Sequence, residues 1–490
     1  MNLLAKLSWL ARWERKNPDA LIHLGPAKDD LLLLGQAFAN ILIFGQVGSG
    51  KTTGIGAALA YSLLLHHSRP GFFVACQKPD EAERWLRYSR QCGRFNDVIH
   101  VKPGGRHTID ILDFETSCHG GGVEQAESLL GIIMEVANRN KTRNSADSFW
   151  PESAQRQMRF AMMIIRMAGI ACGLRELMMF CMSLPTTPEQ LKDPKWRKDS
   201  FAVNCLLGAS ENFPNDPTLE MAGEWLVKEW PELSDKTRSI IQSVTLTTLD
   251  KLLTSQFADL LNGETTFRPE EVLRDGKIVI WDCPGSVYGL PAILSTVSMK
   301  VLFQRACMRR DLSKQCRPFV LWTDEAANFC VPDVDAMFLS QSRQFKCICV
   351  NIVQNIPLIV TALGGNDTAR NQAHAWISNH SLIVGAANSD PETNKHLSAL
   401  AGEERETLYG GSSGGMQQFD LLDDFMGIPT SNVTANWNQT FRPALPPERF
   451  LDLAKGGKES GFIQQAYVFQ SGRKFSNGKT WIKGAWKQKF

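Results

Sequence analysis

The stretch "GQVGSGKTT", Gly45–Thr53, has the residue types and spacing of a phosphate-binding loop. It fits GxxxxGK[ST] and lies between the apolar run "NILIF" and a helical stretch, the order that such a loop requires. Lys51 is expected to reach the β and γ phosphates of ATP, and the Thr52 hydroxyl to ligate Mg²⁺. The alternative is a glycine-rich turn with an exposed lysine. The predicted nucleotide-binding residues are Gly45, Gln46, Val47, Gly48, Ser49, Gly50, Lys51, Thr52 and Thr53.

Two later apolar runs end in acids that could complete this site. "FVLWTDE" ends in Asp324 and Glu325, and "KIVIWD" ends in Asp282. We favour the first pair, because Asp324 can order the Mg²⁺ shell while Glu325 polarises the attacking water. Asp282 is followed by Cys and Pro and offers no candidate base. Paired acids after a strand favour hydrolysis over phosphate transfer to a small molecule.

The stretch "SRQFKCICVNIVQN" has a candidate residue at each end of a predicted strand. Gln354 lies at the carboxyl end, where ligands gather in open α/β sheets, and is predicted to contact the γ phosphate. Arg343 precedes the strand and is predicted to serve a neighbouring subunit as an arginine finger. The alternatives are a solvent-facing Arg343 and a Gln354 satisfied by backbone groups.

The composition indicates a folded globular protein. The chain has 490 residues, 43% of them hydrophobic and 21% charged, which suffices for a large core and a subsidiary domain. The net charge of +2 does not by itself indicate a nucleic-acid partner. The 12 cysteines contain no CxxC pair and are expected to be reduced core residues rather than metal ligands or disulfides.

Short apolar runs alternate with helical stretches in the first hundred residues, which predicts an α/β layer with a largely parallel sheet. Between about Asp147 and Leu249 the strand signals vanish, so we expect an all-helical insertion. Strands resume at "GKIVIWDCP", so the sheet draws on both sides of that insertion. The glycine- and serine-rich stretch Leu408–Gln418 predicts a mobile loop.

Together these residues resemble a known family, the type IV secretion coupling proteins. These are conjugative TraG/TraD-like ATPases of the FtsK/HerA superfamily of ring-forming motors. The matching segments follow one another in family order: the phosphate-binding loop, "FFVACQKPDE", "VKPGGRHTIDILDFE", "SFWPESA", "LRDGKIVIWDCPG", "TDEAANF", "SRQFKCICVNIVQN" and "NHSLIVGAANSDPETNKHLSALAG".

The resemblance implies a RecA-like P-loop NTPase sheet flanked by helices, with an inserted all-α domain. It also implies a hexameric ring, supports Arg343 and Gln354 as site residues, and makes DNA and secretion-channel or adaptor proteins the expected partners. The domains expected are an N-terminal amphipathic helix (1–18), the nucleotide-binding domain in two parts (19–146 and 250–455), the all-α domain (147–249) and a basic aromatic C-terminal tail (456–490).

Coupling proteins usually carry N-terminal transmembrane helices, whereas "MNLLAKLSWLARWERK" predicts a short amphipathic helix. We therefore expect a cytoplasmic protein, with membrane contact at the inner face peripheral or indirect. The C-terminal tail is predicted either to bind DNA or to form a terminal hairpin whose aromatic residues pack on the core. Its basic and aromatic residues are Arg473, Lys474, Lys479, Lys483, Lys487 and Lys489, with Phe475, Trp481, Trp486 and Phe490.

The sequence therefore predicts a hexameric ATP-hydrolysing motor that couples or translocates DNA to a conjugative secretion apparatus. One alternative is an ATP-switched receptor that recruits protein substrates through the helical insertion. Another is a DNA-processing or defence ATPase of the same superfamily.

Overall fold

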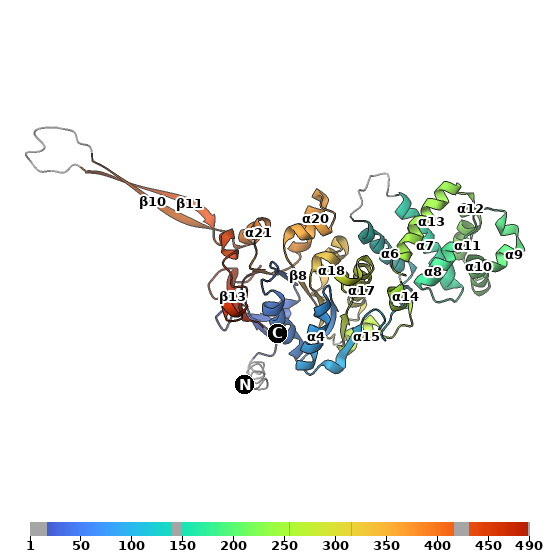
Figure 1. Cartoon of the computed structure of the whole chain (residues 1–490), viewed down its shortest axis with the longest axis horizontal. Coiled ribbons are helices and arrows are strands. Elements are labelled where there is room, and N and C mark those ends of the chain that lie inside the picture. Colours follow the sequence, from blue (N-terminus) through green and yellow to red (C-terminus); the bar gives the residue numbers. More distant parts are fainter. Residues whose placement is uncertain (1–16, 140–148, 254, 315, 416–430, 489–490) are drawn as a thin grey trace, which may run out of the picture.

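A nine-stranded sheet forms the centre of the computed structural model (Figure 1). The structure describes residues 17–139, 149–253, 255–314, 316–415 and 431–488. The predicted helix at 1–18 and the predicted boundary near residue 147 fall largely or wholly outside these ranges. In spatial order the strands are β13 (Trp481–Lys487), β12 (Ile463–Gln470), β9 (Leu382–Ala386), β3 (Ile41–Phe44), β8 (Cys347–Val353), β7 (Phe319–Thr323), β4 (Gly71–Ala75), β6 (Ile278–Trp281) and β5 (Val98–Val101).

The seven strands from β9 to β5 are parallel to one another, which confirms the predicted parallel sheet. β8 lies between β3 and β7, so the strand that precedes the phosphate-binding loop and the strand that precedes the acid pair are both its neighbours. All these strands therefore end at one edge of the sheet. Only β12 and β13 run antiparallel, at the far edge beyond β9.

The two faces of the sheet carry separate hydrophobic clusters, because successive side chains in a strand point to opposite faces. Ile41 and Ile43 face one cluster, whereas Leu42 and Phe44 face the other. The first face is covered by α2 (Leu34–Ala37), α3 (Ala57–Leu65), α4 (Pro79–Gln91) and a small antiparallel pair, β1 (Ala20–His23) and β2 (Leu31–Leu33).

The second face is covered by a larger set of helices. They are α5 (Ile111–Ser117), α6 (Val123–Asn138), α15 (Pro269–Asp275), α16 (Gly285–Tyr288), α17 (Leu290–Arg309), α18 (Pro332–Gln341), α19 (Ile356–Ala362), α20 (Asp367–Ser378) and α21 (Pro391–Ala401). Short helical turns join the elements of the body: η1 (Thr52–Gly56), η2 (Phe95–Asp97), η6 (Ala326–Phe329), η7 (Pro447–Phe450) and η8 (Lys458–Ser460).

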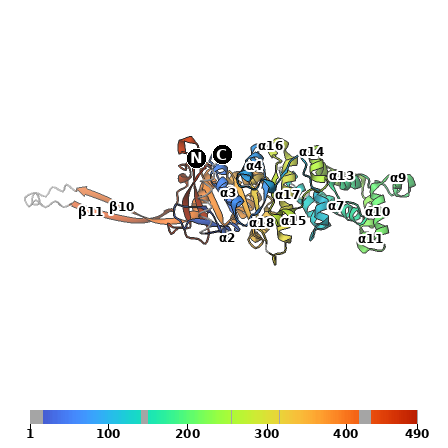
Figure 2. The ribbon, with the colours of Figure 1, turned by 90° about the horizontal axis from the view of Figure 1, so that it is seen from below.

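The described residues between 149 and 262 are helical and extend from the sheet at one end of the molecule (Figures 1 and 2). Their core continues that of the sheet, since Phe160, Trp225 and Trp230 pack at tilted angles within the same hydrophobic cluster. The elements are α7 (Phe149–Met167), α8 (Leu174–Met182), η4 (Gln190–Lys192), α9 (Pro194–Asp199), α10 (Phe201–Asn212), α11 (Pro217–Glu224), η5 (Trp225–Glu229), α12 (Trp230–Glu232), α13 (Asp235–Asp250) and α14 (Ser255–Asn262).

A two-stranded arm projects from the opposite end of the molecule (Figures 1 and 2). It consists of β10 (Glu403–Gly415) and β11 (Ser431–Pro443), paired antiparallel along their whole length. The prediction of a loop over Leu408–Gln418 was therefore wrong for residues 408–415. The glycines are held extended because β11 supplies a complete ladder of backbone partners, from Leu408↔Asn438 to Gly415↔Ser431.

The C-terminal residues 463–487 form the hairpin β12–β13 at one edge of the sheet, as in the second of the two predicted forms. Phe475 and Trp486 are buried in the core, and the Trp486 indole N–H donates to the His23 carbonyl at 3.0 Å. Within the described residues, each helix is too short or too polar to cross a bilayer.

His380, which directly precedes β9, makes the stability of this core dependent on pH. Its Nδ1 lies 3.0 Å from the Trp376 carbonyl and so carries the proton, while Nε2 accepts from the Asn351 amide at 2.9 Å. Complete burial lowers the pKa of His380 to about 4, from an ordinary value of 6.5. The folded state therefore favours neutral imidazole, and this contribution is lost as pH falls from 6.5 toward 4.

We expect His380→Gln to flatten the acid side of the stability curve. Between pH 7 and pH 5 the parent chain should lose about 2 kcal/mol of unfolding free energy more than the variant loses. Thermal or urea unfolding of both proteins at the two pH values measures this difference. Equal losses in parent and variant would contradict the assignment.

Candidate functional site

The phosphate-binding loop links β3 to the helical turn η1 and is held by the neighbouring strands. The Gly45 N–H donates to the Val353 carbonyl at the end of β8, at 3.2 Å. The Gln46 N–H donates to the Ala387 carbonyl after β9, at 3.0 Å. Gly48 and Gly50 have φ of 75° and 76°, a conformation that favours glycine. The loop can therefore curl tightly at the start of the following helix.

Lys51 places a buried positive charge inside this loop. Its residue is only 6% exposed, and its ammonium lies 3.9 Å from the nearest recorded carboxylate oxygen, Oε1 of Glu325. Burial lowers the pKa of Lys51, against the opposing effect of Glu325 and Asp324. A phosphate bound in the loop would supply the close anion that this cation lacks.

Thr52 and Asp324 bring two hard oxygen ligands together. The Thr52 hydroxyl donates to Oδ2 of Asp324 at 3.0 Å, joining the start of η1 to the end of β7. Mg²⁺ is bound in proteins by few carboxylates and hydroxyls together with waters and phosphates. The hydroxyl of Ser49 in the same loop is buried without a hydrogen-bond partner among the described residues. These side chains fit Mg²⁺ and a nucleotide phosphate.

The carboxylate of Glu325 lies at the centre of the site. Oε1 accepts a hydrogen bond from Lys78 at 2.6 Å, and the Gln354 amide lies 3.3 Å and 3.2 Å from Oε1 and Oε2. Burial opposes the negative charge, yet Lys78, Lys51 and Gln354 together hold the pKa of Glu325 below its usual range. The group is therefore ionised near neutral pH and able to orient a water molecule.

The backbone of Glu325 is strained in a way typical of functional residues. Its φ of 50° and ψ of 46° are left-handed, which costs a residue other than glycine on the order of 1 kcal/mol. Its N–H donates to Oδ1 of Asp324 at 2.9 Å and so stabilises this turn. The turn directs the two adjacent carboxylates to different partners, Asp324 to Thr52 and Glu325 to Lys78 and Gln354.

The two ends of β8 carry the other predicted residues. Gln354 follows the strand and reaches Glu325, while its carbonyl accepts from the Asn388 amide at 2.9 Å. Arg343 lies before the strand and is exposed. β8 has seven residues, so the two ends are separated by roughly 20 Å. Arg343 is therefore remote from the phosphate-binding loop of its own chain, and its role in a neighbouring subunit stays a prediction.

Asp282, the alternative acid, follows β6 on the side of β4 that is remote from β3. Its Oδ2 lies 2.9 Å from Nε2 of His100 on β5, and its N–H donates to the Val101 carbonyl. Asp282 therefore contacts groups of the neighbouring strand β5, whereas Asp324 is the acid that contacts Thr52.

Sequence reasoning missed Lys78 and Glu81, which follow β4. Oε2 of Glu81 accepts from the N–H groups of Gln77 and Lys78, at 2.7 Å and 3.3 Å, and so fixes the turn that carries Lys78. Burial and the nearby Asp324 raise the pKa of Glu81 to about 8. The signal was present in "QKPDE", a strand end followed by a lysine and acids, but the pairing of β4 with β7 was needed to interpret it.

It also missed two glutamines near the C-terminus. The Gln464 side chain accepts from the Ile55 N–H at 3.2 Å, and the Gln488 amide donates to the Thr53 hydroxyl at 2.7 Å. Because the Ile55 N–H donates to Gln464, the Lys51 carbonyl accepts its hydrogen bond from the Gly56 N–H instead, at 2.9 Å. This spacing of five residues makes η1 a π-helical turn. The hairpin β12–β13 therefore supports the phosphate-binding loop directly.

Comparisons with known proteins agree with this geometry. Residues 318–455 match the family described as the TraM recognition site of TraD and TraG. The plasmid coupling protein TrwB in complex with the ATP analogue ADPNP aligns over 99% of this chain and 92% of that chain, at 14% identity and a TM-score of 0.62. TrwB in complex with ADP and Mg²⁺ aligns with the same coverage and identity, at 0.61. A comparison with curated proteins finds no match.

The fold is the RecA-like P-loop fold, with a mostly parallel sheet flanked by helices. The resemblance to the TraG/TraD-like type IV coupling proteins is confirmed, in sequence over residues 318–455 and in fold over nearly the whole chain.

Proposed function

We propose that this protein is an ATP-hydrolysing motor of the coupling-protein type, which moves DNA toward a conjugative or related type IV secretion apparatus. The observation that carries the proposal is the carboxylate of Glu325, held beside Lys51 and the Thr52–Asp324 pair by Lys78 and Gln354. A water-orienting base next to a phosphate-binding loop is the arrangement that ATP hydrolysis needs. TrwB, whose fold it shares, is a conjugative coupling protein.

Each residue has a defined task in this proposal. Lys51 and the backbone of the loop bind the β and γ phosphates, while Thr52 and Asp324 hold Mg²⁺. Mg²⁺ held by these two side chains would neutralise the charge that develops on the phosphates during transfer. Glu325 accepts a hydrogen bond from the attacking water and so orients it. Gln354 lies where it can contact both this carboxylate and the terminal phosphate.

Lys78 is a positioning residue for Glu325. Its 2.6 Å ion pair fixes Oε1, and its side chain remains 44% exposed, so it reaches the carboxylate from the rim of the site. The pKa of Lys78 is raised, because Asp324 and Glu325 outweigh the effect of burial. Lys78 and Glu325 are therefore both charged near neutral pH, and Lys78 together with Gln354 limits the rotation of that carboxylate.

The first prediction from this proposed function concerns Lys78→Ala. It should lower kcat for ATP hydrolysis about tenfold, since one partly exposed charge-assisted hydrogen bond is lost, with little change in KM. Lys78→Arg should restore most of the rate. Lys102→Ala, at an exposed lysine after the edge strand β5, is the matched control and should leave both constants unchanged. A Lys78→Ala enzyme with parental kcat would remove Lys78 from the proposal.

The second prediction separates nucleotide binding from hydrolysis. Lys51→Ala should abolish turnover and weaken binding of ATP, whereas Glu325→Gln should bind ATP normally and hydrolyse it at least a hundredfold more slowly. In the parent chain, DNA should stimulate ATP hydrolysis. Binding is measured with a fluorescent nucleotide, and hydrolysis by phosphate release with and without DNA at several salt concentrations. Equal hydrolysis with and without DNA would contradict a DNA motor.

We further propose a ring, hexameric as in the expected family, in which Arg343 completes the site of the adjacent subunit. Its exposure and its place at the far end of β8 support this proposal, because the residue is free of its own site. An arginine beside the γ phosphate stabilises the charge of the transition state.

The third prediction tests this arrangement by mixing subunits. Arg343→Ala and Glu325→Gln should each be inactive alone, while an equimolar mixture should recover part of the parental rate. Recovery is expected because some interfaces then join an intact Glu325 to an intact Arg343. Phosphate release by the mixture is compared with that of each variant. No recovery, from subunits shown to assemble, would place Arg343 outside the neighbouring site.

A second candidate function is an ATP-switched receptor for protein substrates. The match to a TraM recognition family favours it, as does an open cavity of about 410 Å³ beside α10 and α11. Phe213 lines this cavity, and Leu207 and Met221 are also exposed on these helices. A chain that binds no DNA but retains a protein partner through this surface would favour the receptor.

A further inference from the structure

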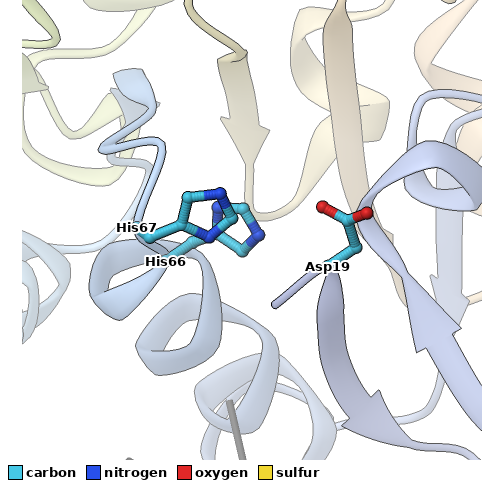
Figure 3. A group of neighbouring side chains, drawn as sticks. All are labelled: Asp19, His66 and His67. Atoms are coloured by element: carbon cyan, nitrogen blue, oxygen red, sulfur yellow. The ribbon is translucent and has the colours of Figure 1, made fainter. Parts of the chain in front are cut away.

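A cluster of three potential metal ligands lies away from the nucleotide site. Asp19 precedes β1, while His66 and His67 directly follow α3, and the three side chains lie close to one another (Figure 3). Their ligating atoms all lie within 4.8 Å of one another. The cluster is at the end of α3 remote from Thr52, roughly 20 Å along the helix axis. It is therefore separate from the Mg²⁺ ligands described above.

His66 shows an unsatisfied polar atom at this place. The residue is 3% exposed, and its Nε2 has no hydrogen-bond partner in the described part of the chain. Buried polar side-chain atoms usually have a partner, so this ring nitrogen is one that a ligand could satisfy. The two other residues, Asp19 and His67, are exposed and free to adjust their side chains.

The other ring nitrogen of His66 has the contact that a metal-binding histidine needs. Nδ1 lies 2.8 Å from the Ser68 hydroxyl, which can accept its proton and leave the lone pair of Nε2 bare. The Ser68 N–H, 3.2 Å from the same nitrogen, favours the opposite tautomer. A metal ion bound to Nε2 would favour the tautomer in which Nδ1 carries the proton and donates to the Ser68 hydroxyl.

Two of the three candidate ligands are the imidazoles of adjacent residues, His66 and His67. Metal ligands must be deprotonated, and neutral imidazole is the binding form. The rings of His66 and His67 are tilted by 36° to one another, with centroids 4.3 Å apart.

We propose that Asp19, His66 and His67 bind one divalent transition-metal ion, with Zn²⁺ as the expected occupant. Two imidazole nitrogens and one carboxylate oxygen are ligands that Zn²⁺ accepts, and a water completes four-coordination. The ligand atoms must close to about 3.3 Å from one another, which rotation of the two exposed side chains permits. The ion joins the start of β1 to the end of the helix that carries the phosphate-binding loop at its other end.

The test uses the full chain after removal of metals with a chelator, titrated with Co²⁺ as a coloured substitute for Zn²⁺. We expect one Co²⁺ per chain, with visible absorption bands of tetrahedral nitrogen and oxygen coordination, and displacement by Zn²⁺. Zn²⁺ should also raise the melting temperature, because it binds the folded state. His67→Gln and Asp19→Asn, both at exposed positions, should each weaken binding by about tenfold or more.

The matched control is His374→Gln, an exposed histidine beside His396 and outside any three-ligand cluster of the described residues. It should bind Co²⁺ as the parent does. The proposal is overturned if the double variant Asp19→Asn/His67→Gln binds Co²⁺ like the parent, or if no Co²⁺ binds. A strong sulfur-to-cobalt charge-transfer band would also overturn it, because it would assign the ion to cysteines.

Discussion

One carboxylate, that of Glu325, joins groups from three strands of the sheet. Lys78 follows β4, Gln354 follows β8, and Lys51 lies in the loop after β3. The arrangement exists only because β8 separates β3 from β7, so that the acid pair lies one strand away from the loop. The strained backbone of Glu325 is part of the same constraint.

The site brings together two lysines and two acids, so its formal charges cancel without a bound anion, although Lys51 lies 3.9 Å from the carboxylate of Glu325. Lys51 and Lys78 face Asp324 and Glu325, while Glu81, whose pKa is raised to about 8, is largely uncharged near neutral pH. A buried cation kept 3.9 Å from its nearest recorded counter-ion costs desolvation energy that a direct ion pair would recover. In the proposed function a bound phosphate would supply this counter-ion, and electrostatic preorganisation of this kind is a main source of catalysis.

Much of this could be predicted from the sequence, for local reasons. The phosphate-binding loop, the acid pair and the parallel sheet are encoded in short segments whose patterns identify them. The positions of Lys78, Gln464 and Gln488 depend on which strands are neighbours, which no local pattern reveals. The stretch Leu408–Gly415 shows the opposite error, because its glycines predict a loop while a distant partner strand holds it extended. Short sequence patterns therefore identified the candidate site residues, whereas the residues that support them depend on strand pairing between distant segments.

The order of the strands also governs how the chain can reach this state during synthesis. β3 lies between β8 and β9, so residues 41–44 have no neighbours in the sheet until residues 347–386 have been made. At ribosomal rates, this delay of on the order of 300 residues lasts roughly 15–60 s. Through that interval an apolar strand and its glycine loop remain without their sheet partners, while the helices of residues 149–262 can already form from contacts close in sequence. The candidate site is thus begun early in the described chain and completed only after β8 and β9, and unpaired β3 is an apolar segment that a chaperone could shield in the meantime.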